Sequence, residues 1–320
     1  MASRRIALGA LGVGIFAPGF ALAQTARPRS VIVLYAGEPE DDEPAMRPFF
    51  EEMRRLGWEE GRNVAYERVF GKGMRDYVDG LARAAASQSP DLIYATTGTL
   101  ALAVLPVVFT AASDPVAAGL VKSLQAPGRN ATGAYQVTID VVLQRFRVVR
   151  EVFPALKRIG IVHDRGATSF AQQRDAHEAA AKKVGLQAVS AEFTNYEAIA
   201  KIFANFRRDG INVVALAPSF SLLSRRREVC AAAARNELAL VSHRVEWAEA
   251  GSLVSYGAEI AEALRRSAGI ANRVLKGAAP GGIPVERVTN FEFAVNRRTA
   301  TSLAVTVPKS VLQRANRVFD

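Results

Sequence analysis

Wholly apolar runs and amphipathic stretches alternate along the chain from residue 30 onward. The first run, residues 31–35, is apolar at every position, which is typical of a strand buried on both faces of a sheet. The next stretch, residues 44–56, carries apolar side chains at helical spacing and stops before Gly57, a residue type that commonly follows a helix. By the same reasoning the first half contains further strands at 63–69, 91–95 and 105–109 and a helix at 76–87.

The second half of the chain repeats this alternation. A helix with Asn195 as its N-cap is expected to carry Ile199, Phe203 and Phe206 on one face and to end before Gly210. Around it lie predicted strands at 158–162, 186–192, 212–217 and 238–241, and predicted helices at 168–184 and from 218 to 235. Three later segments follow, a strand at 252–256, a long helix at 259–275 and a strand at 288–295.

This alternation predicts an α/β protein with two doubly wound parallel-sheet lobes joined by a multi-strand hinge. Alternating strands and helices build parallel sheets with helices on both faces. A chain of 320 residues also exceeds the size at which one hydrophobic core usually keeps growing. The last three segments are expected to cross between the lobes and complete each. Lobe I then comprises residues 24–136 and 257–286, and lobe II residues 137–256 and 287–320.

The N-terminus has the pattern of a secretory signal peptide, residues 1–23. Arg4 and Arg5 precede an apolar stretch, and small residues flank Leu22 just before Gln24. The alternative, a membrane anchor, is disfavoured because the stretch is short and contains Pro18. We therefore expect a periplasmic protein, exported by the Sec or the twin-arginine route.

The distribution of charge argues against a nucleic-acid-binding protein, and the cysteine content gives no sign of a disulfide. The formal net charge is +10, but basic residues are scattered among acids, and even the triplet 225–227 is better explained by solvated helix faces than by nucleic acid. The single cysteine, Cys230, lies in an alanine-rich run and is expected to be a small buried hydrophobic residue. We therefore expect no nucleic-acid partner.

Common enzymatic motifs are absent from the sequence. It contains no GxSxG, Walker A or HExxH motif. The three histidines, His163, His177 and His243, are far apart, and His177 is interpreted as a surface residue of a helix. We predict no catalytic residue, no metal site and no cofactor.

Polar residues follow several predicted strands, at the sheet edge where open α/β folds bind ligands. Thr97, Gly98 and Thr99 follow one strand, where hydroxyl groups and free backbone N–H groups could hold a carboxylate. An ordinary helix cap explains this local sequence equally well. Phe220 occupies a comparable position after a strand of lobe II. These residues are candidates for ligand binding.

Short motifs in order along the chain resemble those of ABC-transporter substrate-binding proteins, a family that includes tryptophan- and tyrosine-binding members. No single motif is decisive, but together their order and spacing are characteristic. They lie at residues 56–58, 60–63, 97–99, 106–109, 114–116, 119–121, 127–128, 130–133, 250–253, 255–257, 275–277, 284–286, 291–292 and 296.

The resemblance implies a type I periplasmic-binding-protein fold that holds a small molecule between two closing lobes. It implies an ABC permease and its ATPase as partners, and we expect a monomer. It also extends the candidate ligand-binding set, Thr97, Gly98 and Thr99, to Asp114 and Tyr256. The ligand class suggested is an amino acid or small carboxylate. Two alternatives are a sensor of the same fold that presents its ligand to a membrane receptor, and a periplasmic enzyme.

The chain departs from the family pattern after Thr99. Only residues 100–105 separate this motif from the next predicted strand, whereas a helical crossover between parallel strands normally needs about a dozen residues. We expect the strand at 105–109 to stay in the sheet, with a turn or short helix replacing the full one. Leu100 and Leu102 are then expected to be unusually exposed.

Overall fold

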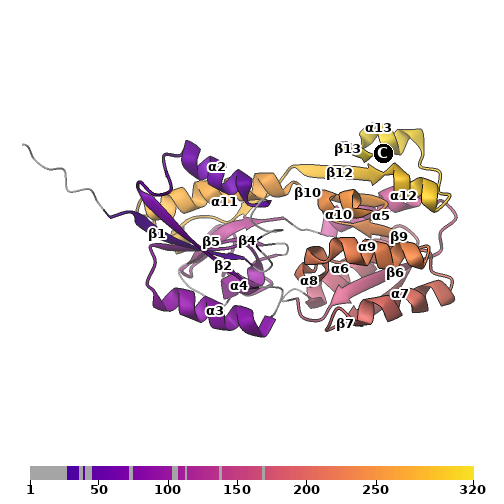
Figure 1. Ribbon diagram of the computed structural model, residues 1–320, viewed down its shortest axis with the longest axis horizontal. Helices are drawn as coiled ribbons and strands as arrows, with labels where there is room; N and C mark the ends of the chain where they lie inside the picture. The colour runs from indigo at the N-terminus through magenta and orange to yellow at the C-terminus, as the bar shows by residue number, and fades with distance from the viewer. Residues whose placement is uncertain are drawn as a thin grey trace, which may run out of the picture.

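A computed structural model describes residues 27–35, 39, 45–71, 75–102, 107–111, 114–136, 139–167 and 170–320. Over this part of the chain, two open sheets with flanking helices form two lobes that lie end to end along the molecule (Figure 1). The predicted α/β class with two sheet-based lobes is therefore confirmed. The predicted signal peptide, residues 1–23, lies outside the described residues.

Lobe I contains a six-stranded sheet in the order β11-β5-β4-β3-β1-β2, and its paired strands are all parallel. Val33 on β1 lies opposite Arg68 on β2 and Tyr94 on β3, which places β1 inside the sheet. The strands are β1 (Arg29–Tyr35), β2 (Val64–Phe70), β3 (Leu92–Ala95), β4 (Val107–Ala111), β5 (Ala131–Tyr135) and β11 (Glu286–Arg287).

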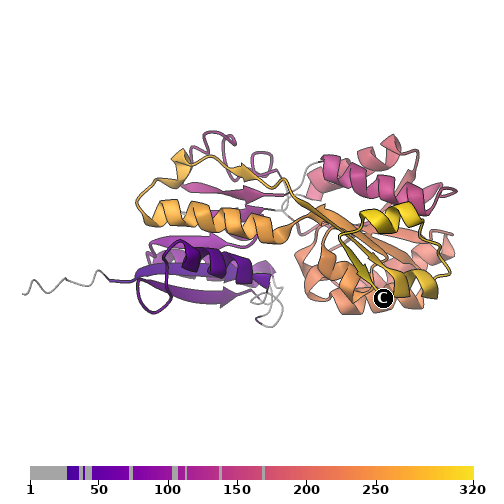
Figure 2. The ribbon, with the colours of Figure 1, turned by 90° about the horizontal axis from the view of Figure 1, so that it is seen from above.

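Helices cover both faces of this sheet, which explains why residues 31–35 of β1 are all apolar. Val31 and Val33 belong to the core formed with α2 and α11, whereas Ile32 and Leu34 belong to the core formed with α3 and α4. Figure 2 shows α2 and α11 side by side along lobe I. The helices are α2 (Arg47–Arg55), α3 (Arg75–Ser87), α4 (Gly98–Leu102) and α11 (Ile260–Leu275), with a short 3-10 turn at Pro280–Gly282.

Lobe II contains a seven-stranded sheet in the order β13-β12-β10-β9-β8-β6-β7. The sheet is parallel except at one pair, β10 and β12, which are antiparallel, with Tyr256 opposite Phe293. The chain enters β12 directly from lobe I and so approaches from the other end of the sheet. The strands are β6 (Arg158–Asp164), β7 (Gln187–Phe193), β8 (Val213–Leu216), β9 (Ala239–Ser242), β10 (Val254–Ala258), β12 (Phe291–Asn296) and β13 (Arg317–Phe319).

Two groups of helices cover the two faces of the lobe II sheet. Phe146 on α5 and Ala180 on α6 belong to one core, and Phe203 on α7 and Trp247 on α10 belong to the other. The first group is α5 (Ile139–Val152), α6 (Phe170–Lys183), α12 (Arg297–Ser302) and α13 (Lys309–Arg314). The second is α7 (Ala198–Arg208), α8 (Phe220–Ser224), α9 (Arg226–Arg235) and α10 (Val245–Ala250).

The chain passes between the lobes after β5, after β10 and after β11. The last two crossings lie against each other, since the backbone N–H of Glu259 donates to the carbonyl oxygen of Asn290 at 2.9 Å. A hinge made of several parallel connections restricts the relative motion of two lobes more than a single linker does.

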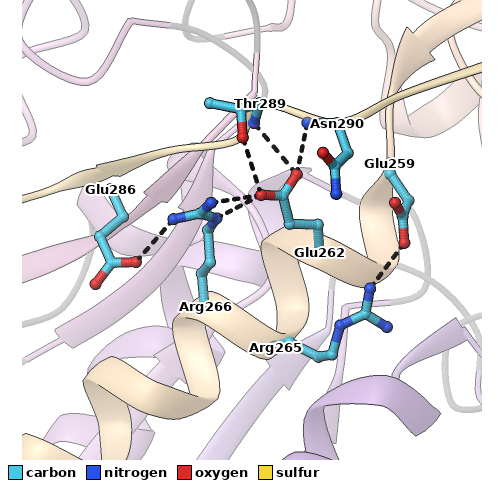
Figure 3. Close-up of polar contacts among 7 residues, drawn as sticks. All are labelled: Glu259, Glu262, Arg265, Arg266, Glu286, Thr289 and Asn290. Atoms are coloured by element: carbon cyan, nitrogen blue, oxygen red, sulfur yellow. Dashed lines mark hydrogen bonds and ion pairs between the residues drawn. The ribbon is translucent and has the colours of Figure 1, made fainter.

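The buried carboxylate of Glu262, in the first turn of α11, fixes the crossing between β11 and β12 (Figure 3). It accepts hydrogen bonds from the backbone N–H groups of Thr289 at 3.2 Å and Asn290 at 2.7 Å, and from the Thr289 hydroxyl at 3.3 Å. Arg266, one turn further along α11, donates to it through Nε at 2.7 Å and also contacts Glu286. Burial raises the pKa of Glu262, but the Asn290 N–H and Arg266 outweigh burial and lower it. The carboxylate is therefore ionised at neutral pH.

The shortened crossover after β3 is a five-residue helix, α4. As predicted, the following strand stays in the sheet, where β4 pairs with β3 and with β5. The expected exposure of Leu100 is wrong, because only 2% of this residue is exposed and it packs in the core with α3. The side chain of Leu102 lies outside the described residues. The short helix thus still covers the sheet with its apolar side chains.

Two local expectations for lobe II are also wrong. Helix α7 begins at Ala198 with Glu197 as its N-cap, and no side chain caps it, so Asn195 does not have the predicted role. His177 is buried rather than on the surface, because it lies on the face of α6 that packs against Phe146 of α5. Cys230, in contrast, is buried and unpaired as expected, and burial raises the pKa of its thiol to about 12.

Candidate functional site

A cavity of about 120 Å³ lies between the lobes. It offers roughly ten times the space that one water molecule requires, so it has room for a small molecule. Both lobes and the first turns of α11 contribute to its wall. The lining residues are Tyr35, Ala45, Met46, Thr96, Thr97, Thr110, Leu223, Ser224, Arg226, Arg244, Glu246, Ile260 and Leu264.

Lobe I contributes hydroxyl groups at the carboxyl ends of its strands. The Thr96 hydroxyl, directly after β3, donates to the carbonyl oxygen of Leu34 at 3.0 Å. The Thr97 hydroxyl accepts from the N–H of Leu100 at 3.3 Å, so it caps α4. Thr97 therefore caps α4 and also lines the cavity, and its contact with a ligand carboxylate stays a prediction.

The Thr110 hydroxyl belongs to a buried chain of hydrogen bonds behind the wall of the cavity. It lies 2.6 Å from the hydroxyl oxygen of Tyr94 and 2.9 Å from that of Ser267 on α11. This chain ties β3, β4 and α11 together in lobe I. Each of these buried hydroxyl groups therefore has a hydrogen-bond partner inside the lobe.

Lobe II contributes the charged side chains of the wall. Arg244 precedes α10 and donates through Nε to a carboxylate oxygen of Glu246 at 3.1 Å, with a second contact through Nη2. Arg226, the first residue of α9, donates to the carbonyl oxygen of Leu223 at 3.2 Å. Burial raises the pKa of Glu246, but the charge and hydrogen bond of Arg244, a backbone hydrogen bond and the charge of Arg226 together outweigh burial and lower the pKa, so Glu246 is ionised at neutral pH.

Apolar side chains complete the wall. Ile260 and Leu264 come from α11, Met46 from the start of α2 and Leu223 from α8. Guanidinium groups recognise carboxylates well, and a few polar groups in a largely apolar pocket fix the orientation of a small ligand. The arrangement can therefore hold a small molecule that has an anionic and an apolar part.

The structure brings only part of the predicted ligand-binding set to this cavity. Thr97 lines it. Gly98 begins α4, and its Cα faces the side chain of Leu120. The side chains of Thr99 and of Phe220, the first residue of α8, lie outside the described residues.

Asp114 and Tyr256, two further residues of the predicted ligand-binding set, do not line this cavity. Asp114 is exposed, and its carboxylate accepts from the N–H groups of Val116 at 2.8 Å and Ala117 at 3.2 Å, which orders its own loop. Tyr256 is half-buried on β10, with its ring beside those of Phe291 and Phe293. Local geometry thus gives both residues a structural role.

Polar residues at the strand ends of lobe II bind one another and do not line the cavity. Asp164, the last residue of β6, accepts from the hydroxyl groups of Ser219 at 2.8 Å and Ser221 at 3.0 Å. Its other carboxylate oxygen accepts from the N–H of Gly166 at 2.8 Å. The carboxylate therefore links the ends of β6 and α8.

Sequence reasoning missed the charged side of the cavity. Arg226 belongs to a triplet that was attributed to solvated helix faces, yet it lines the space between the lobes. Arg244 and Glu246 follow β9, and ligand sites in open α/β folds lie after strand ends, so this rule would have indicated both residues.

Among the described residues, no group of three or more His, Cys, Asp or Glu side chains is placed to hold a metal ion. Within the same part of the chain, none of the helices is both long and apolar enough to cross a membrane.

A family model described as ABC transporter substrate binding protein matches residues 43–319, which include most of both lobes and every lining residue of the cavity except Tyr35. The chain belongs to this family. Members are ligand-binding proteins that work with ABC transporters outside the cytoplasm. This confirms the family resemblance seen in the sequence motifs.

Individual relatives agree with this assignment. The chain is 25% identical over 266 residues to the tyrosine-binding protein of Clostridioides difficile (strain R20291), a match that covers 81% of this chain and 76% of that relative. A conserved domain protein from Vibrio cholerae superimposes with a TM-score of 0.85 at 23% identity, covering 91% of this chain and all of the other. An ABC domain from Streptococcus pneumonia in complex with L-Trp gives a TM-score of 0.84 at 20% identity, covering 92% of this chain and all of the other. These structures share the type I periplasmic-binding-protein fold.

Proposed function

We propose that this substrate-binding protein captures a small molecule, an amino acid or small carboxylate, for an ABC importer by closing its two lobes around it. The observation that supports this most is the cavity whose wall comes from both lobes. A ligand there contacts both lobes only when they are close together, so binding favours the closed arrangement. The proposal includes a monomer that delivers its ligand, chemically unchanged, to a permease and its ATPase.

Charge and polarity of the wall support this ligand class. The guanidinium groups of Arg226 and Arg244 suit a carboxylate, and the hydroxyl groups of Thr96 and Thr97 can hydrogen-bond to it. The apolar wall from α11 suits an aliphatic or aromatic group. The relatives named for tyrosine and crystallised with L-Trp carry ligands of this kind.

A thermal-shift screen of amino acids and small carboxylates, followed by calorimetry of the hits, tests the proposal. A ligand at one hundred times its dissociation constant is expected to add about 2.7 kcal/mol to the free energy of unfolding. Replacing Arg226 by Met should then weaken binding about 10- to 100-fold, because it removes a charged hydrogen-bond donor.

Arg227→Met is the matched control, since this neighbouring side chain is exposed, and the control variant should bind like the native protein. Equal affinity of the two variants would contradict the assignment of the cavity as the ligand site. If the ligand is converted into a different compound during incubation with the protein, the protein is an enzyme and the proposed transport function is contradicted.

We also propose that the mature chain is periplasmic and begins at Gln24. The positive and apolar N-terminal pattern before this residue supports cleavage, by signal peptidase, after Ala23. N-terminal sequencing of protein from the periplasmic fraction should therefore start at Gln24. Recovery of chains that retain Met1 would contradict export by cleavage.

A further inference from the structure

All three histidines of the chain lie together with a buried arginine inside lobe II. Arg145 is on α5, His163 on β6, His177 on α6, and His243 follows β9 directly. Arg145, His163 and His177 are each only 1% exposed. The rings of His163 and His177 meet edge to face with 5.6 Å between their centroids. His243 is half-buried. Residues remote in sequence thus form one largely buried polar cluster.

Several nitrogen atoms of this cluster have no hydrogen-bond partner among the described residues: Arg145 Nη1, both ring nitrogens of His163, Nε2 of His177 and Nδ1 of His243. Nδ1 of His177 lies 2.7 Å from the carbonyl oxygen of Gln173 and must donate to it. In the neutral ring Nε2 is then left as a bare proton acceptor. The cluster therefore contains buried bases that can still take up protons.

The surroundings keep these bases neutral. Burial lowers the pKa of His163 to about 4, and Arg174 opposes protonation while Glu178 favours it. Burial, together with the charge of Arg145, lowers the pKa of His177 to about 3. Burial also lowers the pKa of His243 well below its ordinary value, and three cationic or basic neighbours, Arg145, Arg244 and His177, act in the same direction. Apart from Glu178, the charged groups facing the rings are arginines.

The cluster supports β10, the strand that leads into the crossing to lobe I. Nε of Arg145 donates to the carbonyl oxygen of Tyr256 at 2.9 Å. The carbonyl oxygen of His243 lies so close to Gly257 that a Cβ there would come within 1.7 Å of it. His243 also directly precedes Arg244, which lines the cavity. A change in the cluster therefore acts on the hinge strand and on the cavity wall.

We propose that Arg145 and the three histidines form an acid-sensitive brace, which holds β10 at neutral pH and releases it when the imidazoles take up protons. The brace consists of residues outside the ligand cavity, and the inference does not depend on the ligand class. In the folded protein each imidazole binds its proton only at low pH, whereas in the unfolded chain it does so near pH 6.5. Between these values the unfolded state holds more protons, so stability is complete above pH 6.5 and is lost as the pH falls.

Equilibrium urea unfolding of the full chain at pH 7 and pH 5 tests the brace. Replacing Trp58 of lobe I by Phe leaves Trp247, buried in lobe II, as the single tryptophan reporter. From pH 7 to pH 5 the unfolding equilibrium constant should rise roughly 20- to 30-fold for His163 and by a similar factor for His177, and several hundredfold for the two together. Most carboxylates stay ionised in this range.

The variant that carries both His163→Asn and His177→Asn should lose most of this pH dependence. An equal pH dependence in this variant and the native chain would overturn the proposal. Hydrogen exchange, corrected for the intrinsic effect of pH, should be faster at pH 5 in residues 256–258, and unchanged protection there would contradict release of β10.

Nuclear magnetic resonance of the native chain provides a test that needs no variant. The three imidazole signals should not titrate between pH 7.5 and pH 5.5, because all three rings stay neutral in the folded state. If the signal of any histidine titrates with a midpoint near pH 6.5, the ordinary pKa of histidine, that ring is not held neutral by the fold and the proposed brace is contradicted.

Discussion

Replacing Gly257 by Ala is expected to destabilise the protein by about 3–5 kcal/mol, enough to prevent folding of a marginally stable domain. A Cβ at this position would lie 1.7 Å from the carbonyl oxygen of His243 and 2.7 Å from its carbonyl carbon. These atoms belong to the main chain, so no side-chain rotation relieves the overlap. Strand β10 would have to separate from the segment after β9. Urea unfolding of any soluble variant, or its recovery in inclusion bodies, measures the effect.

Gly269→Ala is the matched control, because it makes the same chemical change on α11, where the new Cβ would meet no atom within 4 Å beyond the adjoining backbone of the helix itself. Alanine favours the helix interior by up to about 1 kcal/mol over glycine, so this variant should be slightly more stable than the native protein. If Gly257→Ala unfolds at the same urea concentration as Gly269→Ala, the close approach of β10 to residue 243 is contradicted.

Replacing Glu262 by Gln is expected to cost about 2–3 kcal/mol of stability and to loosen the crossing between β11 and β12. The amide has a single oxygen in place of two, so it cannot accept from the N–H groups of Thr289 and Asn290 and also pair with Arg266. Hydrogen exchange of Thr289 and Asn290 should accelerate together with the loss of stability. Calorimetric unfolding and exchange mass spectrometry measure the two effects.

The pH dependence of this variant should change in a defined direction. The pKa of Glu262 is lowered in the folded protein, so its contribution is present above the unfolded pKa near 4.5 and is lost as the pH falls below that value. Glu262→Gln should therefore lose less stability on acidification than the native chain. Glu259→Gln, which removes a more exposed ion pair with Arg265, should change stability by less than about 1 kcal/mol. Similar losses in the two glutamine variants would contradict the special role of Glu262.

Helices and strands could be predicted from the sequence where their own residues show a hydrophobic pattern or an end residue such as glycine. Residues 31–35 of β1 are all apolar because both faces of the strand are buried there, and α2 ends just before Gly57, which adopts a φ of +94°. Strand β5 gives no such signal, since it contains Gly133, which β4 approaches so closely that a Cβ would lie 2.1 Å from the carbonyl oxygen of Phe109. Likewise, the antiparallel direction of β12 follows from the path of the chain between the lobes and not from residues 291–296 themselves.

Some residues of the candidate site could likewise be predicted from the sequence, and others could not. Thr97 could be found because it follows a strand end, a rule that needs only the order of elements. Arg226 could not be separated from its exposed neighbour Arg227 by sequence, because the difference between the two side chains comes from the tertiary structure, in which Arg226 contacts Leu223 and lines the cavity with residues of lobe I. The burial of Leu100 was missed for a related reason, since a five-residue helix still reaches the core when α3 lies beside it.

The late position of α11 in the chain determines the order in which the protein can fold during its synthesis. Leu264 and Ala268 of α11 complete one side of the lobe I core, yet they leave the ribosome well over a hundred residues after β5. Lobe II in turn needs β12 and β13, which follow α11 in the chain. Lobe I therefore cannot reach its final packing until α11 has been made, and lobe II cannot do so until β12 and β13 have been made, so each lobe waits with an unfinished core long after most of its own strands have left the ribosome.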